Sequence, residues 1–409
     1  MFEKSPLAPV GVPDMPSIPG VRVAGMAAGL KESGRPDLFM ADLAAGTTVA
    51  GVFTQSACAS APVEWCRKVL SGGAARGIVV NSGNANAFTG KAGDKTVAHT
   101  VRTAAQLIGC RQKEIFVAST GVIGVPVPQD YVGRMLKKLH KRLAPGAWPD
   151  AAEAILTTDT FAKMATRTAR IGGTEVTLAG IAKGSGMIAP DMATMLSFIF
   201  TDANIPAPVL QTMLRRTADR SFNCITVDSD TSTSDTLLLA ATGQADHPAV
   251  TSAGGRAAAE FRAALEELAV DLATQVVKDG EGAQKFVTID IKGAASDRAA
   301  RRIGLAVANS PLVKTAIAGS DANWGRVVMA VGKAGEKADR DRMSISFGGI
   351  DITRRGKQVA DYDEAAIERH LAGQDVDLAV DVGVGKGAAR VWTCDLTHGY
   401  ITINADYRT

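Results

Sequence analysis

The residues with the clearest chemical potential lie in one stretch, 183–196, where a loop-forming segment runs into a short apolar segment. Two glycines and a proline in its first half predict a loop, and the apolar run 196–200 predicts a buried strand. A small residue, Ala193, therefore precedes a hydroxyl residue, Thr194, at the entry to the core. A threonine hydroxyl placed there can attack the preceding carbonyl carbon and shift the acyl group from nitrogen to oxygen. Water would then release a new terminus, so the pattern predicts self-cleavage between Ala193 and Thr194.

After such a cleavage Thr194 would carry a nucleophile and a base in one residue. Its new α-amino group, with a reference pKa of roughly 7.7–8.0, can accept the proton of its own hydroxyl. The alternative interpretation of this stretch is an ordinary glycine-rich connection, in which Thr194 is a β-branched residue that fills the start of a strand. The other polar turns of the chain decide between these interpretations.

A second candidate lies where the predicted strand 114–118 ends in Ser119-Thr120-Gly121. A glycine directly after a hydroxyl residue leaves the backbone free to aim its N–H groups outward. Two such donors, at Thr120 and Gly121, could hold the oxyanion of an acyl-transfer intermediate. A simple turn is the alternative for this segment.

Two further turns combine hydroxyl and acidic residues. Thr157 begins the turn 157–160, and Glu281 lies between two glycines just after a long predicted helix. An acid held in this way is well placed to contact a ligand, although a surface turn explains the pattern equally well. The amide-rich loop 81–87 also allows a binding role, with the capping of turns as its default interpretation.

The elements that must position these residues follow from the spacing of apolar side chains. Helical spacing predicts helices over 94–110, 128–143, 206–220, 255–278 and 297–308. Short apolar or alternating runs predict strands over 47–53, 77–81, 114–118, 174–179, 196–200, 224–230, 285–291, 375–384, 388–394 and 400–404. The Gly-x-Gly-x-Gly segment 383–387 lies between two predicted strands, so we interpret it as a hairpin turn and not as a dinucleotide loop. The uneven alternation of elements favours layered sheets covered by helices.

Composition limits the class of protein. The 409 residues exceed a typical single domain and predict two or three lobes. With 46% hydrophobic residues, 42 glycines and only 5% aromatics, the interior should be built from small aliphatic side chains, as in a tightly layered α/β protein. A net charge of +3 is too small to indicate a nucleic acid or an anionic membrane as a partner. No apolar run approaches the ~20 residues of a membrane span.

The cysteines and the N-terminal segment indicate the compartment. Five scattered cysteines without a Cys-x-x-Cys pair are typical of a reducing cytoplasm. Five prolines within the first 20 residues predict an extended arm and exclude the apolar core of a signal peptide. Because no histidine lies near a cysteine or carboxylate at ligand spacing, we expect no structural metal.

Six segments are distinctive when they are taken together. They are Ser119-Thr-Gly-Val-Ile-Gly124, Leu156-Thr-Thr-Asp-Thr160, Lys183 to Leu196, Asp279-Gly-Glu-Gly282, Gly319-Ser-Asp-Ala-Asn-Trp-Gly-Arg326 and Asn404-Ala-Asp-Tyr-Arg-Thr409. Jointly they resemble the ornithine acetyltransferases, the glutamate N-acetyltransferases of arginine biosynthesis. The resemblance runs over nearly the whole chain, and no catalytic position departs from the family pattern.

The resemblance implies an architecture and a maturation step. The expected fold is layered α/β, with two sheets between helices in an αββα-like arrangement that is shared with self-processing aminopeptidases. Cleavage before Thr194 would give an α chain, 1–193, and a β chain, 194–409, with two copies of each in the assembly. The implied location is the cytoplasm.

The resemblance also implies a role for each site residue. Thr194 is the expected nucleophile, and Thr120 and Gly121 form the expected oxyanion hole. The expected substrate contacts are Thr157, Lys183, Thr194, Glu281, Asn404 and Thr409. Chemically, Lys183 supplies a cation and Glu281 an anion, as amino-acid substrates require, and we expect Glu281 to meet the side-chain amine of ornithine.

The implied reaction moves acetyl from N2-acetyl-L-ornithine to L-glutamate through an acetyl-threonine intermediate, with ping-pong kinetics. No cofactor or metal is expected, although some members of the family also accept acetyl-CoA as a donor. One rival is a self-processing aminopeptidase or amidase, in which water replaces glutamate as the acceptor. A second rival is an uncleaved α/β protein without enzymatic activity.

Overall fold

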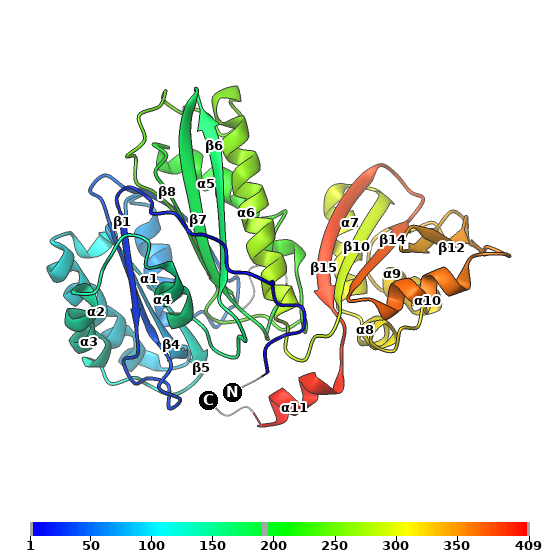
Figure 1. The fold of residues 1–409 in the computed structure, drawn as a ribbon, viewed down its shortest axis with the longest axis horizontal. Coiled ribbons are helices and arrows are strands. Elements are labelled where there is room, and N and C mark those ends of the chain that lie inside the picture. The colour runs from blue at the N-terminus through cyan, green and yellow to red at the C-terminus, as the bar shows by residue number, and fades with distance from the viewer. Residues whose placement is uncertain (1–2, 190–194, 407–409) are drawn as a thin grey trace.

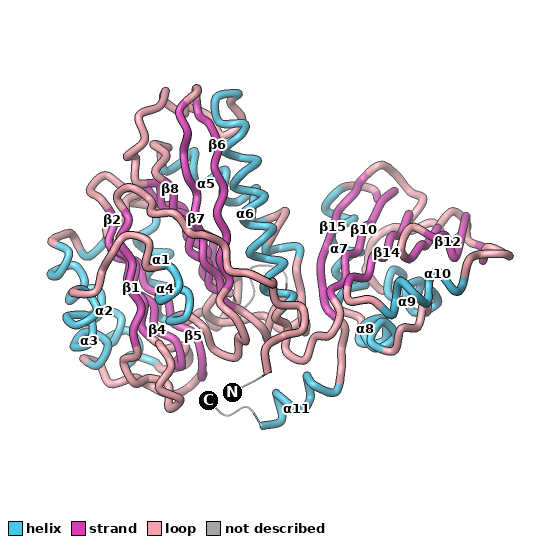
Figure 2. Tube along the Cα trace, in the orientation of Figure 1, coloured by secondary structure: helices cyan, strands magenta, loops and turns pink. Residues whose placement is uncertain are grey.

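The computed structural model describes residues 3–189 and 195–406, and these residues form three β-sheets. Figure 1 shows two lobes. The layered lobe contains the first two sheets with helices α1 to α6, and the second lobe contains the third sheet with helices α7 to α10. Residues 3–20 form an N-terminal arm without a helix or strand, which runs across the layered lobe (Figure 2).

The first sheet has the strand order β1-β2-β4-β5, in which only β4 and β5 run parallel. Its strands are β1 (Val21–Met26), β2 (Leu38–Leu43), β4 (Gly77–Asn84) and β5 (Ile115–Val122). Helices α2 and α3 cover its outer face, while α1 lies beside β5 and α4 lies against β1. These helices are α1 (Ala61–Leu70), α2 (Gly90–Ile108), α3 (Tyr131–His140) and α4 (Trp148–Ala154), and the short 3-10 helix η1 (Gln112–Glu114) precedes β5.

The second sheet has the order β3-β9-β8-β7-β6. Its strands are β3 (Thr48–Phe53), β6 (Lys163–Ile171), β7 (Thr174–Lys183), β8 (Leu196–Thr201) and β9 (Thr236–Ala241). The outer face packs against α5 (Ala207–Ala218) and α6 (Ala259–Lys278), with the 3-10 helices η2 (Phe222–Cys224) and η3 (Arg256–Ala258) nearby.

Successive side chains of β8 point to opposite faces of the second sheet, and this explains how the two sheets stack. Phe198 points inward and lies 5.6 Å from the ring of Phe39 in the first sheet, whereas Ile199 joins the core beneath α5 and α6. Helices therefore lie outside both sheets, and the layered α/β fold with two sheets between helices is confirmed.

The predicted cleavage position separates two neighbouring strands of one sheet. Strand β7 ends before it and β8 begins after it, and the two pair antiparallel from Lys183–Leu196 to Leu178–Thr201. Ala193 and Thr194 themselves lie outside the described residues. Because β3, β6 and β7 precede this position while β8 and β9 follow it, both parts of the chain contribute to the same sheet.

The third sheet has the order β13-β12-β11-β14-β10-β15. Its strands are β10 (Phe286–Ala294), β11 (Ser344–Phe347), β12 (Ile350–Arg354), β13 (Lys357–Gln358), β14 (Asp375–Asp381) and β15 (Gly387–Cys394). The helices of this lobe are α7 (Asp297–Ala308), α8 (Pro311–Ala318), α9 (Trp324–Gly332) and α10 (Glu364–Ala372). Helix α11 (His398–Asp406) then runs back from this lobe towards the layered lobe (Figure 1).

Three sequence-based predictions are wrong, each because strand pairing is a long-range property. Residues 400–404 alternate like a strand but lie in α11, where no neighbouring strand pairs with them and helical bonds satisfy the backbone. Residues 224–230 form no strand, since only Ile225 bridges to Trp392 in β15. Segment 383–387 is not a hairpin, because β14 and β15 lie on opposite sides of β10.

Every helix within residues 3–189 and 195–406 is too short or too polar to cross a bilayer.

We expect the substitution Phe198→Ala to lower the free energy of unfolding by about 3–5 kcal/mol, because it opens a cavity between the two stacked sheets. The measurement is urea denaturation followed by circular dichroism. Leu312→Ala is the control, since that side chain is 51% exposed and its loss should change stability by less than about 0.5 kcal/mol. Equal effects of the two substitutions would contradict the packing described here.

Candidate active site

The ends of two sheets meet where Lys183 approaches Thr120. The ammonium group of Lys183, at the end of β7, donates a hydrogen bond of 3.4 Å to the hydroxyl of Thr120 near the end of β5. Both side chains are buried. Alternation along β5 explains why Thr120, and not Ser119, is available: Ser119 donates to Asn81 of β4 instead. The two sheets thus bring together residues that are 63 positions apart.

Gly121 is required by the backbone around it. Its φ is +129°, and a Cβ atom there would lie 2.4 Å from the carbonyl carbon of Gly83 and 2.6 Å from the nitrogen of Asn84. Any other residue would collide with β4. The neighbouring amides have structural partners, since Asn81 donates to the carbonyl of Asn84 and Asn84 donates to that of Val125. Both side chains therefore hold backbone segments in place, Asn81 within its own turn and Asn84 across to the segment after β5.

Asp159 is the centre of a buried polar network. One carboxylate oxygen accepts hydrogen bonds from Lys163 Nζ and from the backbone nitrogen of Gly184, each at 2.7 Å. The other accepts from the backbone nitrogen of Thr157 at 2.9 Å and lies 4.0 Å from Lys183 Nζ. The turn that contains Thr157 is thereby tied to the end of β7.

Lys163 extends this network to the end of α6. Its ammonium group lies 2.6 Å from a carboxylate oxygen of Asp279, which also accepts from the backbone nitrogen of Thr160 at 2.9 Å. Asp159 and Lys163 are fully buried. Buried charges of this kind are tolerated only when they are paired and hydrogen-bonded, as they are here.

The pKa values in the network follow from this balance of burial and charge. Burial alone would raise the pKa of Asp159, but the ammonium groups of Lys163 and Lys183 outweigh it and hold that pKa below its ordinary range. Burial lowers the pKa of Lys183 even though Asp159 opposes the shift. Asp159 thus stays ionised, and its negative charge offsets part of the effect that burial has on the pKa of Lys183.

Glu281 faces the same region from the segment that follows α6. Its carboxylate accepts a hydrogen bond of 2.7 Å from the side-chain amide of Asn404, and its backbone nitrogen donates to the carbonyl of Ser185 at 3.0 Å. A Cβ atom on Gly186 would lie 2.4 Å from a carboxylate oxygen of Glu281, so the glycine leaves room for this side chain. Burial raises the pKa of Glu281, and the bond from Asn404 opposes that rise.

Helix α11 reaches this region through two polar side chains. Besides Asn404, the hydroxyl of Tyr400 donates to Asp228 at 3.2 Å. Asp228 also accepts from the backbone nitrogens of Met187 at 2.6 Å and Ile188 at 2.8 Å, in the loop that follows β7. The helix that the sequence pattern described as a strand therefore carries a predicted site residue to its place.

The structure brings six predicted site residues into one region. They are Thr120, Gly121, Thr157, Lys183, Glu281 and Asn404. The predicted residues Ala193, Thr194 and Thr409 lie outside the described residues. Sequence reasoning did not assign Asp159, in the turn 157–160, or Lys163, at the start of β6, because their burial is not visible in the sequence.

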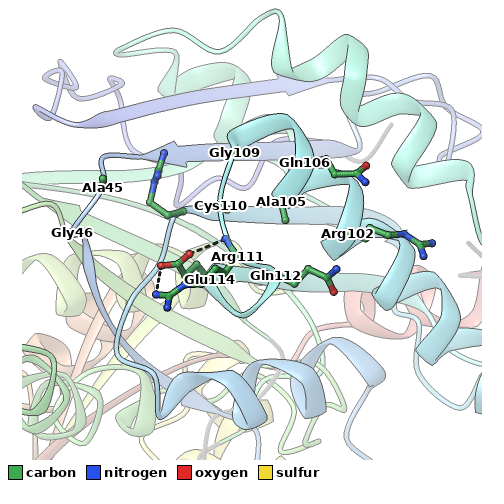
Figure 3. A pocket seen from close by; sticks show the side chains of 11 residues that line it. Ala45, Gly46, Arg102, Ala105, Gln106, Gly109, Cys110, Arg111, Gln112 and Glu114 are labelled. Atoms are coloured by element: carbon green, nitrogen blue, oxygen red, sulfur yellow. Dashed lines mark hydrogen bonds and ion pairs between the residues drawn. The ribbon is translucent and has the colours of Figure 1, made fainter.

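A cavity of about 650 Å³ lies elsewhere, beside the end of α2 (Figure 3). It contains none of the predicted site residues. Two of its arginines lie near acids, Arg111 at 2.8 Å from Glu114 and Arg76 at 4.0 Å from Asp42, and Arg102 extends away from the Arg111–Glu114 pair. The size of a cavity alone therefore does not identify the candidate active site in this protein.

In the part of the chain that the structure describes, no three histidine, cysteine, aspartate or glutamate side chains are grouped so that they could hold a metal ion.

Comparison with known proteins identifies close relatives along the whole chain. A sequence model of the ArgJ family matches residues 22–409. The arginine biosynthesis bifunctional protein ArgJ of Gluconobacter oxydans is 53% identical over 411 residues, covering 100% of this chain and 97% of that protein. The protein of the same name from Mesorhizobium japonicum is 55% identical over 408 residues, or 99% of each. A crystal structure of arginine biosynthesis bifunctional protein argJ from Bacillus halodurans is 37% identical and covers 50% of this chain and 96% of its own, with a TM-score of 0.49.

We expect Asp159→Asn to destabilise the protein by about 3–5 kcal/mol, because it leaves buried ammonium groups without a negative partner. Since the pKa of Asp159 is lowered on folding, its contribution is present at neutral pH and is lost as the pH falls below about 4. Urea denaturation at several pH values measures both effects.

The matched control for this prediction is Asp130→Asn. Asp130 pairs with Arg134 at the same i,i+4 spacing as Asp159 and Lys163, but its side chain is 53% exposed. A surface pair of this kind is worth about 0–1 kcal/mol, so the control should remain close to wild type. If both variants lost equal stability, burial would not be the cause.

Proposed function

The chain belongs to the ArgJ family, and from this membership we propose that it is a self-processing acetyltransferase of arginine biosynthesis. It moves acetyl from N2-acetyl-L-ornithine to L-glutamate. The observation that carries the proposal is the convergence of a buried lysine, a buried hydroxyl group and a partly buried acid in one region, at Lys183, Thr120 and Glu281. N2-acetyl-L-ornithine presents a carboxylate, an amide and a side-chain amine, and these groups complement that set.

The first half-reaction transfers acetyl to the enzyme. The α-amine of Thr194 accepts the proton of its own hydroxyl, and Oγ attacks the acetyl carbonyl carbon. Backbone donors at Thr120 and Gly121 hold the oxyanion, and in analogous sites one such donor is worth roughly 2.7–4 kcal/mol. The bond from carbon to the α-nitrogen of ornithine breaks, the nitrogen takes the proton, and ornithine leaves an acetyl ester on Thr194.

The second half-reaction reverses these steps with glutamate. Its α-amine attacks the ester, the same donors hold the oxyanion, and the threonine hydroxyl is released. The reacting groups of both halves belong to the chain and the two substrates, so the cycle as written needs no cofactor.

Charge complementarity supports the binding roles. Lys183 lies 4.0 Å from Asp159 and in its protonated form suits a substrate carboxylate, while Glu281 suits the side-chain amine of ornithine. Thr157 and Asn404 line the same region, and Thr409 completes the proposed set of substrate contacts. Asp159 is a positioning residue in this scheme because it acts through Lys183 and the turn at Thr157.

The proposal includes a maturation step, an assembly and a location. Cleavage between Ala193 and Thr194 gives an α chain, 1–193, and a β chain, 194–409. Strands on both sides of this position pair in the second sheet, so the two chains remain associated after cleavage. We propose an assembly of two α and two β chains in the cytoplasm, with acetyl-CoA as a second possible donor to Thr194.

Intact mass of the denatured protein tests the maturation step. We expect two masses for the wild type, matching residues 1–193 and 194–409, and one full-length mass for Thr194→Ala, which has no hydroxyl to attack the preceding carbonyl. The variant should also lose acetyl transfer. A single full-length mass for an active wild type would exclude an α-amine on Thr194.

Steady-state kinetics test the acetyl-enzyme. Double-reciprocal plots at several fixed glutamate concentrations should be parallel, since ornithine leaves before glutamate reacts. Intersecting lines would exclude the scheme. Acetate release without glutamate is the control, because release as fast as transfer would identify an amidase instead.

Glu281→Gln should lower kcat/KM for N2-acetylornithine by about tenfold to hundredfold, because a hydrogen bond to a charged group is worth about 1.5–3 kcal/mol. Glutamine retains an oxygen that can accept from Asn404, so local structure is preserved. Glu260→Gln, on the surface near Arg170, is the control and should leave kinetics unchanged. An unaltered kcat/KM in Glu281→Gln would remove Glu281 from the proposed binding site.

A further inference from the structure

Asp235 lies directly before β9, and its side chain is fully buried. Strand β9 runs parallel to β8, with Thr236 opposite Leu196. Asp235 therefore lies at the end of the sheet where β8 begins, next to the first described residue after the predicted cleavage position. The sequence pattern described its surroundings, 232–235, only as a polar turn.

The side chain of Asp235 and the backbone of Thr236 hold the backbone of Met195. One carboxylate oxygen, Oδ1, accepts a hydrogen bond of 2.9 Å from the Met195 nitrogen, and the nitrogen of Thr236 donates to the Met195 carbonyl at 3.2 Å. The residue that follows Thr194 in the chain is thus fixed through both its backbone polar groups. Covalent connectivity leaves only a few bonds between the Met195 nitrogen and the reacting atoms of Thr194.

Within residues 3–189 and 195–406, the second carboxylate oxygen of Asp235, Oδ2, is buried without a hydrogen-bond partner. Nearly all buried polar atoms in proteins are hydrogen-bonded, so an unpartnered carboxylate oxygen needs an explanation. Asp42 and Asp395 also carry such an oxygen, but Asp42 lies near Arg76 and Asp395 accepts from the backbone at 284 and 285, away from β8. Among these three acids, Asp235 is the one bonded to Met195.

We propose that Asp235 is the general base of the self-cleavage reaction, with Oδ1 anchored by Met195 and Oδ2 free to accept the hydroxyl proton of Thr194. The inference rests on the proposed self-cleavage and adds the group that starts it. Before cleavage the nitrogen of Thr194 is part of an amide and is not basic, so the base that serves the mature enzyme does not yet exist. A second proton acceptor is required at that stage, and Asp235 supplies it.

Every proton and bond in the self-cleavage step is accounted for. Oδ2 takes the proton from the hydroxyl of Thr194, whose oxygen forms a bond to the carbonyl carbon of Ala193. The bond from this carbon to the nitrogen of Thr194 then breaks, and Asp235 returns the proton to that nitrogen. The products are an ester and an amine, and water hydrolyses the ester to give the free carboxylate of Ala193.

The surroundings of Asp235 make its carboxylate a stronger base. Burial raises the pKa of Asp235 well above its ordinary value, opposed by the Met195 N–H and by the charge of Lys183. The nearby hydroxyl groups of Thr54 and Ser232 also oppose this rise in the pKa. A base works best when its pKa lies near the working pH, and protonation at lower pH removes it.

The test follows cleavage of the full chain after cell-free synthesis, with timed samples run on denaturing gels over a range of pH. Wild-type cleavage should slow as the pH falls through the raised pKa of Asp235. Asp235→Asn keeps an oxygen for the Met195 nitrogen but cannot accept the proton, so it should cleave about 10²–10⁴-fold more slowly and without that pH dependence. Asp235→Glu retains a carboxylate and should recover at least about tenfold of the loss.

Asp202→Asn is the matched control, because Asp202 follows the other end of β8 and accepts from the backbone nitrogen of Thr177 at 2.8 Å. It should cleave at the wild-type rate. Circular dichroism of Thr194→Ala with and without Asp235→Asn compares folding in an uncleaved chain.

Each outcome decides a different point. The proton-transfer role would be overturned if Asp235→Asn cleaved as fast as wild type. It would also be overturned if this variant cleaved slowly but kept the wild-type pH profile. Asp235→Glu cleaving no faster than Asp235→Asn would also overturn it. A wild-type chain that stays whole at every pH would instead overturn the proposed self-cleavage.

Discussion

The active-site region depends on the buried carboxylate of Asp159. It accepts from Thr157 and Gly184 and faces the ammonium groups of Lys163 and Lys183, so it ties a turn, the end of β7 and, through Lys163, the end of α6 together. Without this anion two buried cations would be adjacent with little solvation. The negative charge of Asp159 favours the protonated form of Lys183, which we propose binds a substrate carboxylate.

Steric constraints at two glycines act in addition to the electrostatic constraint at Asp159. Gly121 allows β5 to pass close to β4 with its backbone in a conformation that side chains exclude, and Gly186 leaves room for Glu281. The layered arrangement then brings these segments together, because Thr120 alternates towards the second sheet while Ser119 faces away from it. The proposed catalytic donors and substrate contacts thus come from different sheets, and helix α11 adds Asn404 from the far end of the chain.

A chain that cuts itself must hold both pieces in place. Strands β7 and β8 flank the proposed cleavage position and remain hydrogen-bonded neighbours along six residue pairs. Asp235 and Thr236 fix Met195 at the start of β8. Sheet pairing, which does not depend on the peptide bond between the strands, therefore provides the rigidity that both maturation and acyl transfer require.

Local patterns determined much of this protein. Apolar periodicity predicted helices such as α6 and strands such as β8, and a glycine–hydroxyl turn indicated Thr120 and Gly121, because these signals depend on neighbours in sequence. The family resemblance added Lys183. Tertiary structure alone decided that 400–404 is helical, that β10 separates β14 from β15, and that Asp159, Lys163 and Asp235 are buried next to the site. The physical reason is that strand partners, burial and the pairing of charges arise from residues far apart in the chain.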